Sequence, residues 1–446
     1  METVDVVVVG AGYAGLAAAQ ELHGAGVEVR VLEAQERVGG RVLTAMSRAG
    51  SAVDLGGAWV GNGHDRFAAV VAASGTTTFA SPRQGHPLVG DGVRLRRWRG
   101  RLPPVGLVTG GLVALAAGRL HHAAASVNPI DPWSSPAARS LDGMTLGAWL
   151  HRWLPAGRAR RLVEAVLSES VCADVGEVSL LWFLAALRGS GGLAHAFGGD
   201  GGAQQDLILN GAAAPAEWMA STLGDRVQLS SPVERVDVSD GRVTITGPFE
   251  RIRCTRVVLA MPPPAARRVL DRSGLDCDLR HWLDNAAMGS VLKIVTVYET
   301  PFWRDSGLSG ELLNPDGPLP SVFDTSPPGG PGHLTALVAA GKARALGRLN
   351  PTARRDIVLA ELVRCFGTAA GRPLDLLERW WDEDPWAGGG YGAFARPGVL
   401  TAVRDAVRAP CGPVHLAGSD TSPEYPGYVE GALRSGRRAA AEVLAA

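Results

Sequence analysis

The sequence predicts an α/β domain assembled from three separated segments, with a second domain of mixed sheet and helices, an α+β arrangement, inserted between them. Three observations predict this fold. The chain has 446 residues, which is long for a single core and suits two domains. It opens with a strand, a glycine-rich turn and a helix, the start of a βαβ unit. Similar strand-like runs return in the middle and near the end, separated by stretches of different composition.

The first strand is expected at residues 4–9, because VDVVVV is a β-branched run broken only by Asp5, and such runs form central parallel strands. GAGYAG follows and places Gly10, Gly12 and Gly15 in the pattern G-x-G-x-x-G. Gly10 permits a tight turn, Gly12 lets the backbone approach a pyrophosphate, and Gly15 allows close packing of helix on strand. The N-terminus of the following helix offers free N–H groups to phosphates.

The second strand, VEVRVLEA, is followed closely by Glu36, and its own carboxylate Glu33 lies 23 residues after Gly10. A carboxylate at this position can accept hydrogen bonds from ribose hydroxyls. Because the glycine pattern follows a strand and opens a helix, we interpret the segment as a Rossmann-like dinucleotide-binding motif rather than a structural turn.

The later segments complete this domain in the order of the chain. Residues 226–263 alternate short β-rich runs with turn signals and end on a buried strand at Val257 to Ala260. PVHLAGSD near the C-terminus is again a strand followed by glycine, and a helix ends the chain. Residues of about 79–205 read as helical, whereas about 296–384 mix strands with a helix over Pro351 to Phe366.

We therefore expect two interleaved domains. The dinucleotide-binding domain would comprise residues 1–78, 206–283 and 384–446, and the substrate-binding domain residues 79–205 and 284–383. No internal repeat is visible.

Composition places the chain among soluble globular proteins, with 46% hydrophobic and 20% charged residues. Acidic and basic residues balance at 44 each, so no nucleic-acid partner is expected. The locally basic run Arg94 to Arg101 is interpreted as a solvated loop or hairpin. The apolar run Val105 to Leu120 is shorter than the roughly 20 residues that span a bilayer, so no membrane association is expected.

The cysteines indicate the compartment. Five are present, widely spaced and without a Cys-x-x-Cys pair: Cys172, Cys254, Cys277, Cys365 and Cys411. This pattern favours reduced thiols over a disulfide framework or a metal site. The first strand also begins too early to leave room for a signal peptide. We expect a cytoplasmic protein without a bound metal.

Two further glycine-rich loops indicate which dinucleotide binds. ERVGGR, Glu36 to Arg41, places Gly40 and Arg41 directly after the ribose-binding carboxylate. Glycine suits close approach to a second pyrophosphate face, and the arginine would neutralise its charge. DLGGAWVG, Asp54 to Gly61, adds a loop that contains an aromatic residue. Together these loops resemble the FAD-binding region of the flavin-containing amine oxidase family, the monoamine-oxidase-like flavoenzymes.

The resemblance extends over essentially the whole chain, with matching order and spacing. Five further blocks carry it: Val175 to Leu184, Leu223 to Val238, Met288 to Trp303, Trp380 to Leu400, and His415 to Ala432. The set is specific for the family fold and much less specific for the substrate.

The resemblance implies a Rossmann-like FAD-binding domain and FAD as the cofactor. The residues that would hold it are Gly10, Gly12, Gly15, Glu33, Ala34, Gly40, Arg41, Gly57, Ala58, Trp59, Val233, Trp381, Gly418, Ser419 and Val429. Family members that attach FAD covalently have a cysteine where this chain has Gly390, so non-covalent FAD is expected. The chain also departs from the family pattern in the loop at 210–218 and at Asp420, where a longer carboxylate is common.

Three residues match the family's catalytic positions. Tyr391 and Tyr428 match two tyrosines that form an aromatic sandwich for the amine, and Lys293 matches a lysine that holds a water near flavin N5. Lys293 lies in an apolar strand-like run of a chain whose only other lysine is Lys342. A lysine is a compact point charge, whereas arginine is a larger planar fork. A surface position for Lys293, and core or rim positions for the tyrosines, are the alternatives.

Gln204 resembles a glutamine that lines the substrate cavity in the family. Cys172, His195 and Phe197 are further candidates for the cavity wall, and a satisfied or exposed histidine is the alternative for His195. The implied reaction is oxidation of an amine to an imine, with O₂ reduced to H₂O₂. The partners are then a small-molecule amine and O₂, and a homodimer is left open. The arginine-rich composition is typical of a GC-rich bacterial genome.

Two other functions remain open at this point. One keeps the fold and changes the substrate: an amino-acid oxidase, or a dehydrogenase or desaturase that acts on a bulky secondary metabolite. The other is a flavin-binding partner protein without catalytic activity. The sequence does not identify the amine.

Overall fold

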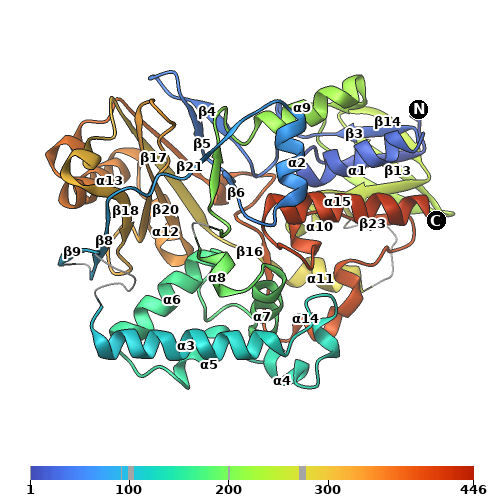
Figure 1. Ribbon diagram of the computed structural model, residues 1–446. Coiled ribbons are helices and arrows are strands. Elements are labelled where there is room, and N and C mark those ends of the chain that lie inside the picture. The colour runs from blue at the N-terminus through green and yellow to red at the C-terminus, as the bar shows by residue number, and fades with distance from the viewer. Residues whose placement is uncertain (1, 92, 99–104, 199–200, 271–277) are drawn as a thin grey trace.

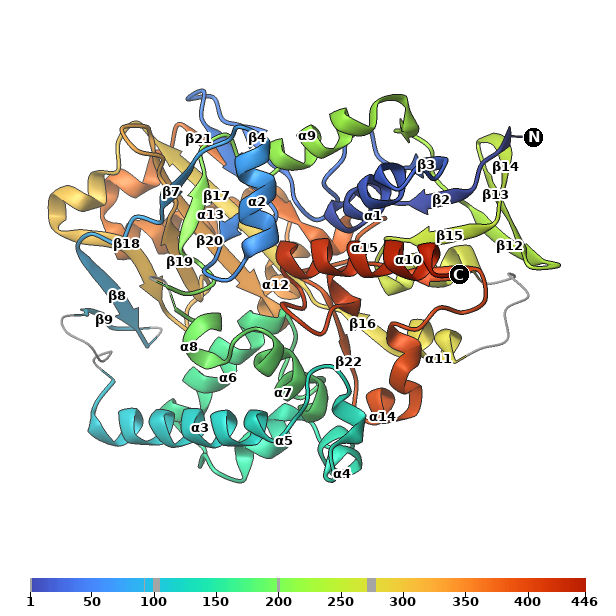
Figure 2. The same cartoon turned by 45° about the vertical axis from the view of Figure 1, so that its right-hand side comes forward.

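The computed structural model describes residues 2–91, 93–98, 105–198, 201–270 and 278–446. Two sheet-containing regions lie side by side, and a layer of helices lies across one side of both (Figure 1). Both chain termini lie at the outer end of the first region (Figures 1 and 2). As the sequence predicts, this region takes its elements from the start, the middle and the end of the chain.

A five-stranded parallel sheet forms the centre of the first region. Its strands, in spatial order, are β11 (Val227–Gln228), β3 (Val29–Leu32), β2 (Val6–Val9), β15 (Arg256–Leu259) and β23 (Val414–Leu416). β2 lies in the middle and pairs in register with β3 on one side and β15 on the other. All four residues of β2 are buried, as expected of a β-branched strand covered on both faces.

Helices cover this sheet and fix the glycine-rich turn. α1 (Tyr13–Gly24) starts directly after the turn, and α15 (Val429–Leu444) packs along it (Figure 2). α9 (Ala214–Leu223) also packs against α1. Gly436 makes the contact of α15 with α1 close, because an added Cβ there would lie 2.1 Å from the Ala14 carbonyl oxygen.

A smaller sheet stands at the outer edge of the first region. Its order is β1 (Glu2–Thr3), β14 (Phe249–Cys254), β13 (Arg242–Gly247) and β12 (Arg235–Ser239). The turn signal between β12 and β13 forms a hairpin, in which Ser239 pairs with Arg242. α10 (Pro263–Leu270) and α11 (Leu279–Asn285) follow β15 and lead to the second region.

The second region is built on a seven-stranded mixed sheet. Its order is β21 (Asp375–Trp380), β17 (Val291–Tyr298), β20 (Gly332–Ala339), β19 (Ser321–Asp324), β18 (Leu308–Leu313), β8 (His86–Gly90) and β9 (Leu95–Arg97). β17 is buried along its whole length and pairs antiparallel with β20 and β21. α12 (Ala340–Gly347) and α13 (Pro351–Phe366) follow β20 in the chain.

Short strands connect the two regions. β4 (Thr44–Met46) pairs with β5 (Ala52–Asp54), and β10 (Asp206–Ile208) joins β6 (Trp59–Val60) to β7 (Thr78–Ala80). β16 (Ala286–Met288) pairs with β22 (Ala393–Ala395). Loops that leave the first sheet therefore continue into the second region. Residues of the first region and residues of the second region can thus line one cavity.

The helical layer comes from the stretch that the sequence predicts as helical. It contains α3 (Leu107–Ala125), α4 (Ala138–Asp142), α5 (Leu146–His151), α6 (Arg158–Val171), α7 (Leu180–Gly189) and α8 (Leu193–Ala196), with α2 (Asp65–Ala73) and α14 (Val399–Val403) elsewhere. Ser179 caps α7 by accepting the Trp182 N–H. Among the described helices, none is long and apolar enough to cross a bilayer.

Two sequence expectations change in detail, and a third, a loop or hairpin for the basic run, is confirmed as a hairpin in its described part. The first strand begins at Val6 rather than Val4. The basic run forms β9 of a hairpin with β8, and its end at residues 99–101 lies outside the described residues. The expectation of five reduced cysteines is wrong at Cys411, which is disulfide-bonded. Cys172, Cys254 and Cys365 are free thiols.

Candidate active site

One cavity of about 1270 Å³ extends from the glycine-rich turn after β2 into the second region. Most of the residues predicted for the site line it: Gly10, Gly12, Glu33, Ala34, Gly40, Arg41, Gly57, Ala58, Trp59, Val233, Trp381, Gly418, Ser419 and Val429, the trio Lys293, Tyr391 and Tyr428, and Phe197 and Gln204. Gly15, Cys172 and His195 do not belong to the lining.

The glycine-rich turn leaves no room for side chains. Gly10 has φ +102°, and an added Cβ would lie 2.6 Å from the Ala260 carbonyl oxygen. A Cβ at Gly15 would lie 1.9 Å from the Gly10 carbonyl oxygen, so Gly15 packs the helix on the strand rather than facing the cavity. Gly12 is different, since its Cβ would meet Gly40 at an ordinary 3.8 Å. Gly12 therefore keeps the cavity wall open.

Glu33 stands where the second strand ends and is nearly inaccessible to solvent. Its carboxylate accepts the Ala11 N–H at 2.7 Å and the Gln35 N–H at 2.9 Å. Burial raises its pKa, and these backbone hydrogen bonds oppose the shift. The residue lines the cavity. This arrangement suits acceptance of hydrogen bonds from a ribose.

Arg41 ties three segments together at the cavity. Its guanidinium makes a two-point ion pair with Asp420, at 2.7 and 3.1 Å, and donates to the Tyr391 carbonyl oxygen at 2.6 Å. A third contact reaches the Ser419 hydroxyl at 3.2 Å. The shorter carboxylate of Asp420 thus reaches its partner, although the family usually has a longer one.

These features fit a flavin dinucleotide. The turn after β2 and the N-terminus of α1 form a cradle that a Cβ would fill, with a ribose acceptor and an arginine beside it. Val429, the first residue of α15, has an N–H without an intrahelical acceptor. Trp381 is fixed at the wall by its indole N–H, which donates to the Leu55 carbonyl oxygen at 2.9 Å.

Lys293 lies in the middle of β17 with 3% exposure, so the surface alternative for it is wrong. Its ammonium donates to the Gly56 carbonyl oxygen at 2.9 Å and lies 5.2 Å from the centre of the Trp59 ring. Burial lowers its pKa to about 8, and the charge of buried Asp54 opposes this shift. Asp54, which we did not single out from the sequence, is itself held by Thr44 and the Ala212 N–H.

Tyr391 and Tyr428 are half-buried and come from different segments. Tyr391 follows a cis peptide bond after Gly390, whereas Tyr428 is the N-cap residue directly before α15. They influence each other electrostatically, but no ring contact joins them among the described residues. Burial raises the pKa of both hydroxyls, that of Tyr428 to about 12. Both rings are therefore uncharged at neutral pH.

Two residues that we expected to line the cavity lie elsewhere. Cys172 is fully buried and belongs to the cluster that packs against Tyr391. His195 packs against His64 at 5.7 Å and Tyr425 at 5.6 Å. The prediction that Cys172 and His195 line the cavity is wrong, because Cys172 lies behind Tyr391 and His195 lies behind His64 and Tyr425. Phe197 and Gln204 do line it.

His64 is buried beside His195 and Tyr428. Its Nδ1 accepts the Gly61 N–H at 2.9 Å, and its ring lies 5.2 Å from the ring of Tyr428. Burial lowers its pKa to about 4, and the charge of His195 acts in the same direction. His64 is therefore neutral at physiological pH and supports Tyr428 by packing.

Sequence reasoning missed several other residues that line the substrate part of the cavity. They include Arg83, Glu169, Trp182, Glu311, Ser321 and Phe323. Glu169 could have been found, because it precedes Cys172 by one helical turn and residues so spaced share a helix face. Trp182 lies on α7 and Arg83 lies between β7 and β8, whereas Glu311, Ser321 and Phe323 come from strands whose order the sequence did not predict.

A family model described as flavin containing amine oxidoreductase matches residues 13–444. Among curated proteins, a Mycobacterium tuberculosis protein named as a flavin-containing monoamine oxidase, AofH, is 36% identical over 99% of this chain and 97% of its own length. Human amine oxidase [flavin-containing] B is 32% identical over 99% of this chain and 86% of its own.

Solved structures agree with this similarity. Putrescine oxidase in complex with putrescine superposes with a TM-score of 0.94 at 30% identity, covering 100% of this chain and 99% of that one. Cyclohexylamine oxidase from Brevibacterium oxydans has the same TM-score and identity, with 99% and 98% coverage. The α/β fold with its mixed second region, predicted from the sequence, is confirmed by both.

Proposed function

The chain belongs to the family of flavin-containing amine oxidoreductases, and from this membership we propose how its cavity oxidises an amine. The enzyme is an FAD-dependent amine oxidase. We propose O₂ as the electron acceptor, with release of H₂O₂. The observation that carries the proposal is the single cavity, lined both by the dinucleotide-binding turn and by the two tyrosines.

FAD supplies the acceptor for the hydrogen and electron pair that leave the amine carbon. We propose that the glycine-rich turn and Glu33 hold its adenosine half. Arg41, Gly418 and Ser419 would lie along its phosphates and ribityl chain, and Val429 would donate to its ring. Gly390 has no thiol, so attachment is non-covalent. A side chain at this position would also meet Val291, since an added Cβ would lie 2.7 Å from Val291 Cγ1.

Tyr391 and Tyr428 are proposed to hold the amine between their rings. Because their hydroxyls have raised pKa values, neither ring carries a negative charge that would keep the amine protonated. A ring pair still tolerates transient positive charge on nitrogen, through cation–π attraction worth about 0.5–2 kcal/mol. Lys293 is proposed to keep an ammonium beside the reacting groups in a water-poor pocket, where such charges act most strongly.

The arginines of the cavity support an amino-acid oxidase less well than an amine oxidase. Such an enzyme needs a cation for the substrate carboxylate. Among the described lining residues, Arg41 pairs with Asp420 and Arg83 lies 3.3 Å from Glu311. Arg268 donates to the Pro385 carbonyl oxygen. Each guanidinium already has an acceptor.

Three further proposals concern the domain division, the cellular location and the oligomeric state. We propose that residues 1–78, 206–283 and 384–446 form the FAD-binding domain and that 79–205 and 284–383 form the substrate domain, a division supported by the two separate sheets. We also propose a cytoplasmic location. The disulfide at Cys411 counts against this location, because disulfides are rare in the cytoplasm. A homodimer is proposed and is measurable by sedimentation.

A steady-state screen tests the central proposal. The purified yellow protein should release peroxide with at least one amine of a panel of primary, secondary and aromatic amines. Bleaching of the flavin by an amine in the absence of oxygen would show the first half of the reaction, in which the amine reduces the flavin. A protein that carries a full complement of FAD but is bleached by no amine would instead be the non-catalytic flavin-binding partner.

A further inference from the structure

Glu169 places a carboxylate on the wall of the substrate part of the cavity. It belongs to the last turn of α6 and lines the cavity together with Val166 and Ser170 of the same helix. One carboxylate oxygen accepts a hydrogen bond from the Ser321 hydroxyl at the start of β19. Across the described residues, no Lys, Arg or His lies within ion-pairing distance of it, and its second oxygen accepts no hydrogen bond.

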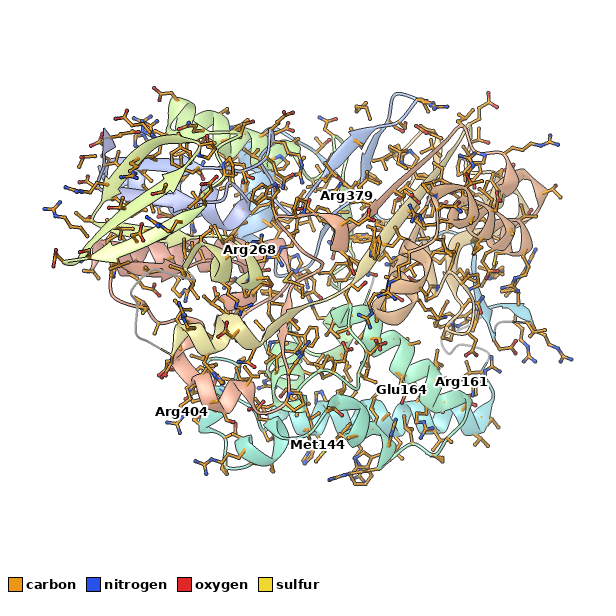
Figure 3. All side chains as sticks on the ribbon, turned by 180° about the vertical axis from the view of Figure 1, so that it is seen from behind. Met144, Arg161, Glu164, Arg268, Arg379 and Arg404 are labelled. Atoms are coloured by element: carbon orange, nitrogen blue, oxygen red, sulfur yellow. The ribbon has the colours of Figure 1, made fainter. Side chains whose placement is uncertain are left out.

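Other charged side chains around this part of the molecule are neutralised. Arg161 of α6 pairs with Asp316 at 3.2 Å, and Glu164 pairs with His151 at 2.8 Å. Both residues are labelled on α6 in Figure 3. Glu311, which lines the same cavity, lies 3.3 Å from Arg83. Glu169 differs from all of these, because it faces the cavity without a cation.

Glu169 also lies close to the tyrosine pair. The Cys172 N–H donates to the Glu169 carbonyl oxygen at 3.3 Å, and the Cys172 thiol donates to the same oxygen at 3.6 Å. Cys172 belongs to the cluster that packs against Tyr391, and the charge of Glu169 acts on the Tyr391 hydroxyl. Glu169 thus lies three residues, about 4.5 Å along a helix axis, before the residue that packs against Tyr391. A short substrate held at the tyrosines would reach the Glu169 carboxylate with its other end.

An uncompensated carboxylate in this position is costly. Burial raises the pKa of Glu169 to about 7, and the hydrogen bond from Ser321 and the charge of Lys342 only partly oppose this shift. The Lys342 ammonium donates to the Pro315 and Gly317 carbonyl oxygens instead. Burying an ionised group without a partner is unfavourable, whereas a bound cation would offset that cost.

We propose that Glu169 binds a second cationic group of the substrate, so that the preferred substrates are short diamines or amines with a second basic nitrogen. The inference rests on the proposed function, in which the tyrosine pair holds the nitrogen that is oxidised. Glu169 acts as a specificity-determining residue. Its carboxylate accepts hydrogen bonds from the far ammonium, while the near amine is neutral between Tyr391 and Tyr428.

The test compares two amines of equal length, pentane-1,5-diamine and pentylamine, by kcat/KM from peroxide release. The wild type should prefer the diamine by about 10- to 100-fold, the size of one hydrogen bond to a charged group. In Glu169→Gln the diamine should lose this advantage and pentylamine should gain, because its apolar end no longer faces a charge. Glu164→Gln removes a carboxylate from the same helix outside the cavity, and it should keep the wild-type preference.

A second measurement uses pH and needs no change at Glu169. The diamine preference should appear as pH rises through about 7, because only the ionised carboxylate attracts the far ammonium. Ser321→Ala removes a hydrogen bond that lowers the pKa, so it should move this rise to higher pH. The other titratable groups near Glu169 are Lys342, Cys172 and Tyr391. Burial raises the pKa of the Cys172 thiol and the Tyr391 hydroxyl, so both stay neutral throughout the rise.

The outcomes separate the two proposals. Equal kcat/KM for both amines in the wild type, or a preference that survives Glu169→Gln, would overturn the role of Glu169 and leave amine oxidation intact. An equal loss for both amines in Glu169→Gln, with no pH-dependent preference in the wild type, would also overturn it and make Glu169 structural. If no amine bleaches the wild-type flavin, the proposed function itself fails.

Discussion

The two ends of the cavity are built in different ways. At the dinucleotide end, the walls are mostly backbone. The turn after β2, the end of β3 and the loop at Gly40 are near neighbours in sequence, and Val233, Gly418 and Val429 join them from later segments. At the substrate end, the walls are side chains from α6, α7, β17, β18 and β19, which are brought together only by packing. The dinucleotide end depends on a particular backbone conformation, whereas the substrate end depends on the chemical groups of particular side chains.

This difference predicts how each end responds to substitution. A backbone-built cradle fails when any Cβ intrudes, whatever its chemistry, because the contact is with backbone that cannot move away. A side-chain-built wall tolerates changes of shape and responds to changes of charge. Substitutions at the first end should therefore affect cofactor content or folding, and those at the second end should affect rate and selectivity.

The largest effect is expected within the glycine pattern itself. Gly15→Ala would place a Cβ 1.9 Å from the Gly10 carbonyl oxygen, so it should lower the free energy of unfolding by about 3 kcal/mol or more, at the upper end of overpacking. Urea unfolding of the FAD-free protein measures this. Gly12→Ala meets no atom closer than 3.8 Å, so it should fold normally yet retain little FAD after gel filtration.

Gly24→Ala provides the matched control. No atom lies within 4 Å of a Cβ at this position, near the end of α1. It should keep full FAD and gain up to about 1 kcal/mol, the difference in helix propensity. If Gly12→Ala binds FAD as tightly as Gly24→Ala does, the turn is not the phosphate cradle.

The next effect is electrostatic and falls on Lys293. Lys293→Met removes the buried ammonium and roughly keeps the side-chain length, so FAD content should survive. Reoxidation of the amine-reduced enzyme by O₂ should slow by about 10²–10³, the scale of losing one preorganised charge. Stopped-flow absorbance measures this rate, and anaerobic reduction by amine should fall less. Wild-type reoxidation in Lys293→Met would leave the residue with a structural role.

A smaller effect is expected at the tyrosine pair. Phe at Tyr391 or Tyr428 should keep most of kcat/KM, because the ring faces rather than the hydroxyls contact the amine. Ala at either position should lose about 1–2 kcal/mol of transition-state stabilisation, the range of a cation–π contact. Steady-state kinetics on one good substrate measures both series. Equal damage from Phe and Ala would instead indicate an essential hydroxyl.

The smallest effect comes from pH alone and again concerns Lys293. Its pKa of about 8 means that the ammonium is present below this pH and lost as pH rises through it. The O₂ reaction of the reduced enzyme should therefore slow above about pH 8, and the Lys293→Met reaction should not change there. Asp54→Asn removes the charge that raises this pKa, so the slowing should begin at lower pH. An unshifted midpoint would show that another group titrates.

If FAD is attached non-covalently, denaturation of the protein should release it unchanged. Acid precipitation of the yellow protein should release all of its flavin as FAD, because Gly390 offers no thiol. Colour that stays with the precipitate would show a covalent bond and contradict the prediction.

The sequence by itself determined the dinucleotide end and the order of the domains. Gly10, Gly15 and Glu33 act through local geometry, since a turn, a helix start and a strand end are encoded by residues within one βαβ unit. Lys293 was also identifiable, because a rare lysine in an apolar strand requires a reason. The tyrosines followed from resemblance, and their surroundings did not.

Only the tertiary structure decided what faces the substrate. It placed Cys172 and His195 away from the wall, and it placed Glu169 on the wall beside Ser321, 152 residues later in the chain. It also brought Asp54 near Lys293. The reason is physical: which face of a helix is buried, and which strand becomes its neighbour, depend on packing between distant segments. Local sequence preferences do not predict contacts between segments that are far apart in the chain.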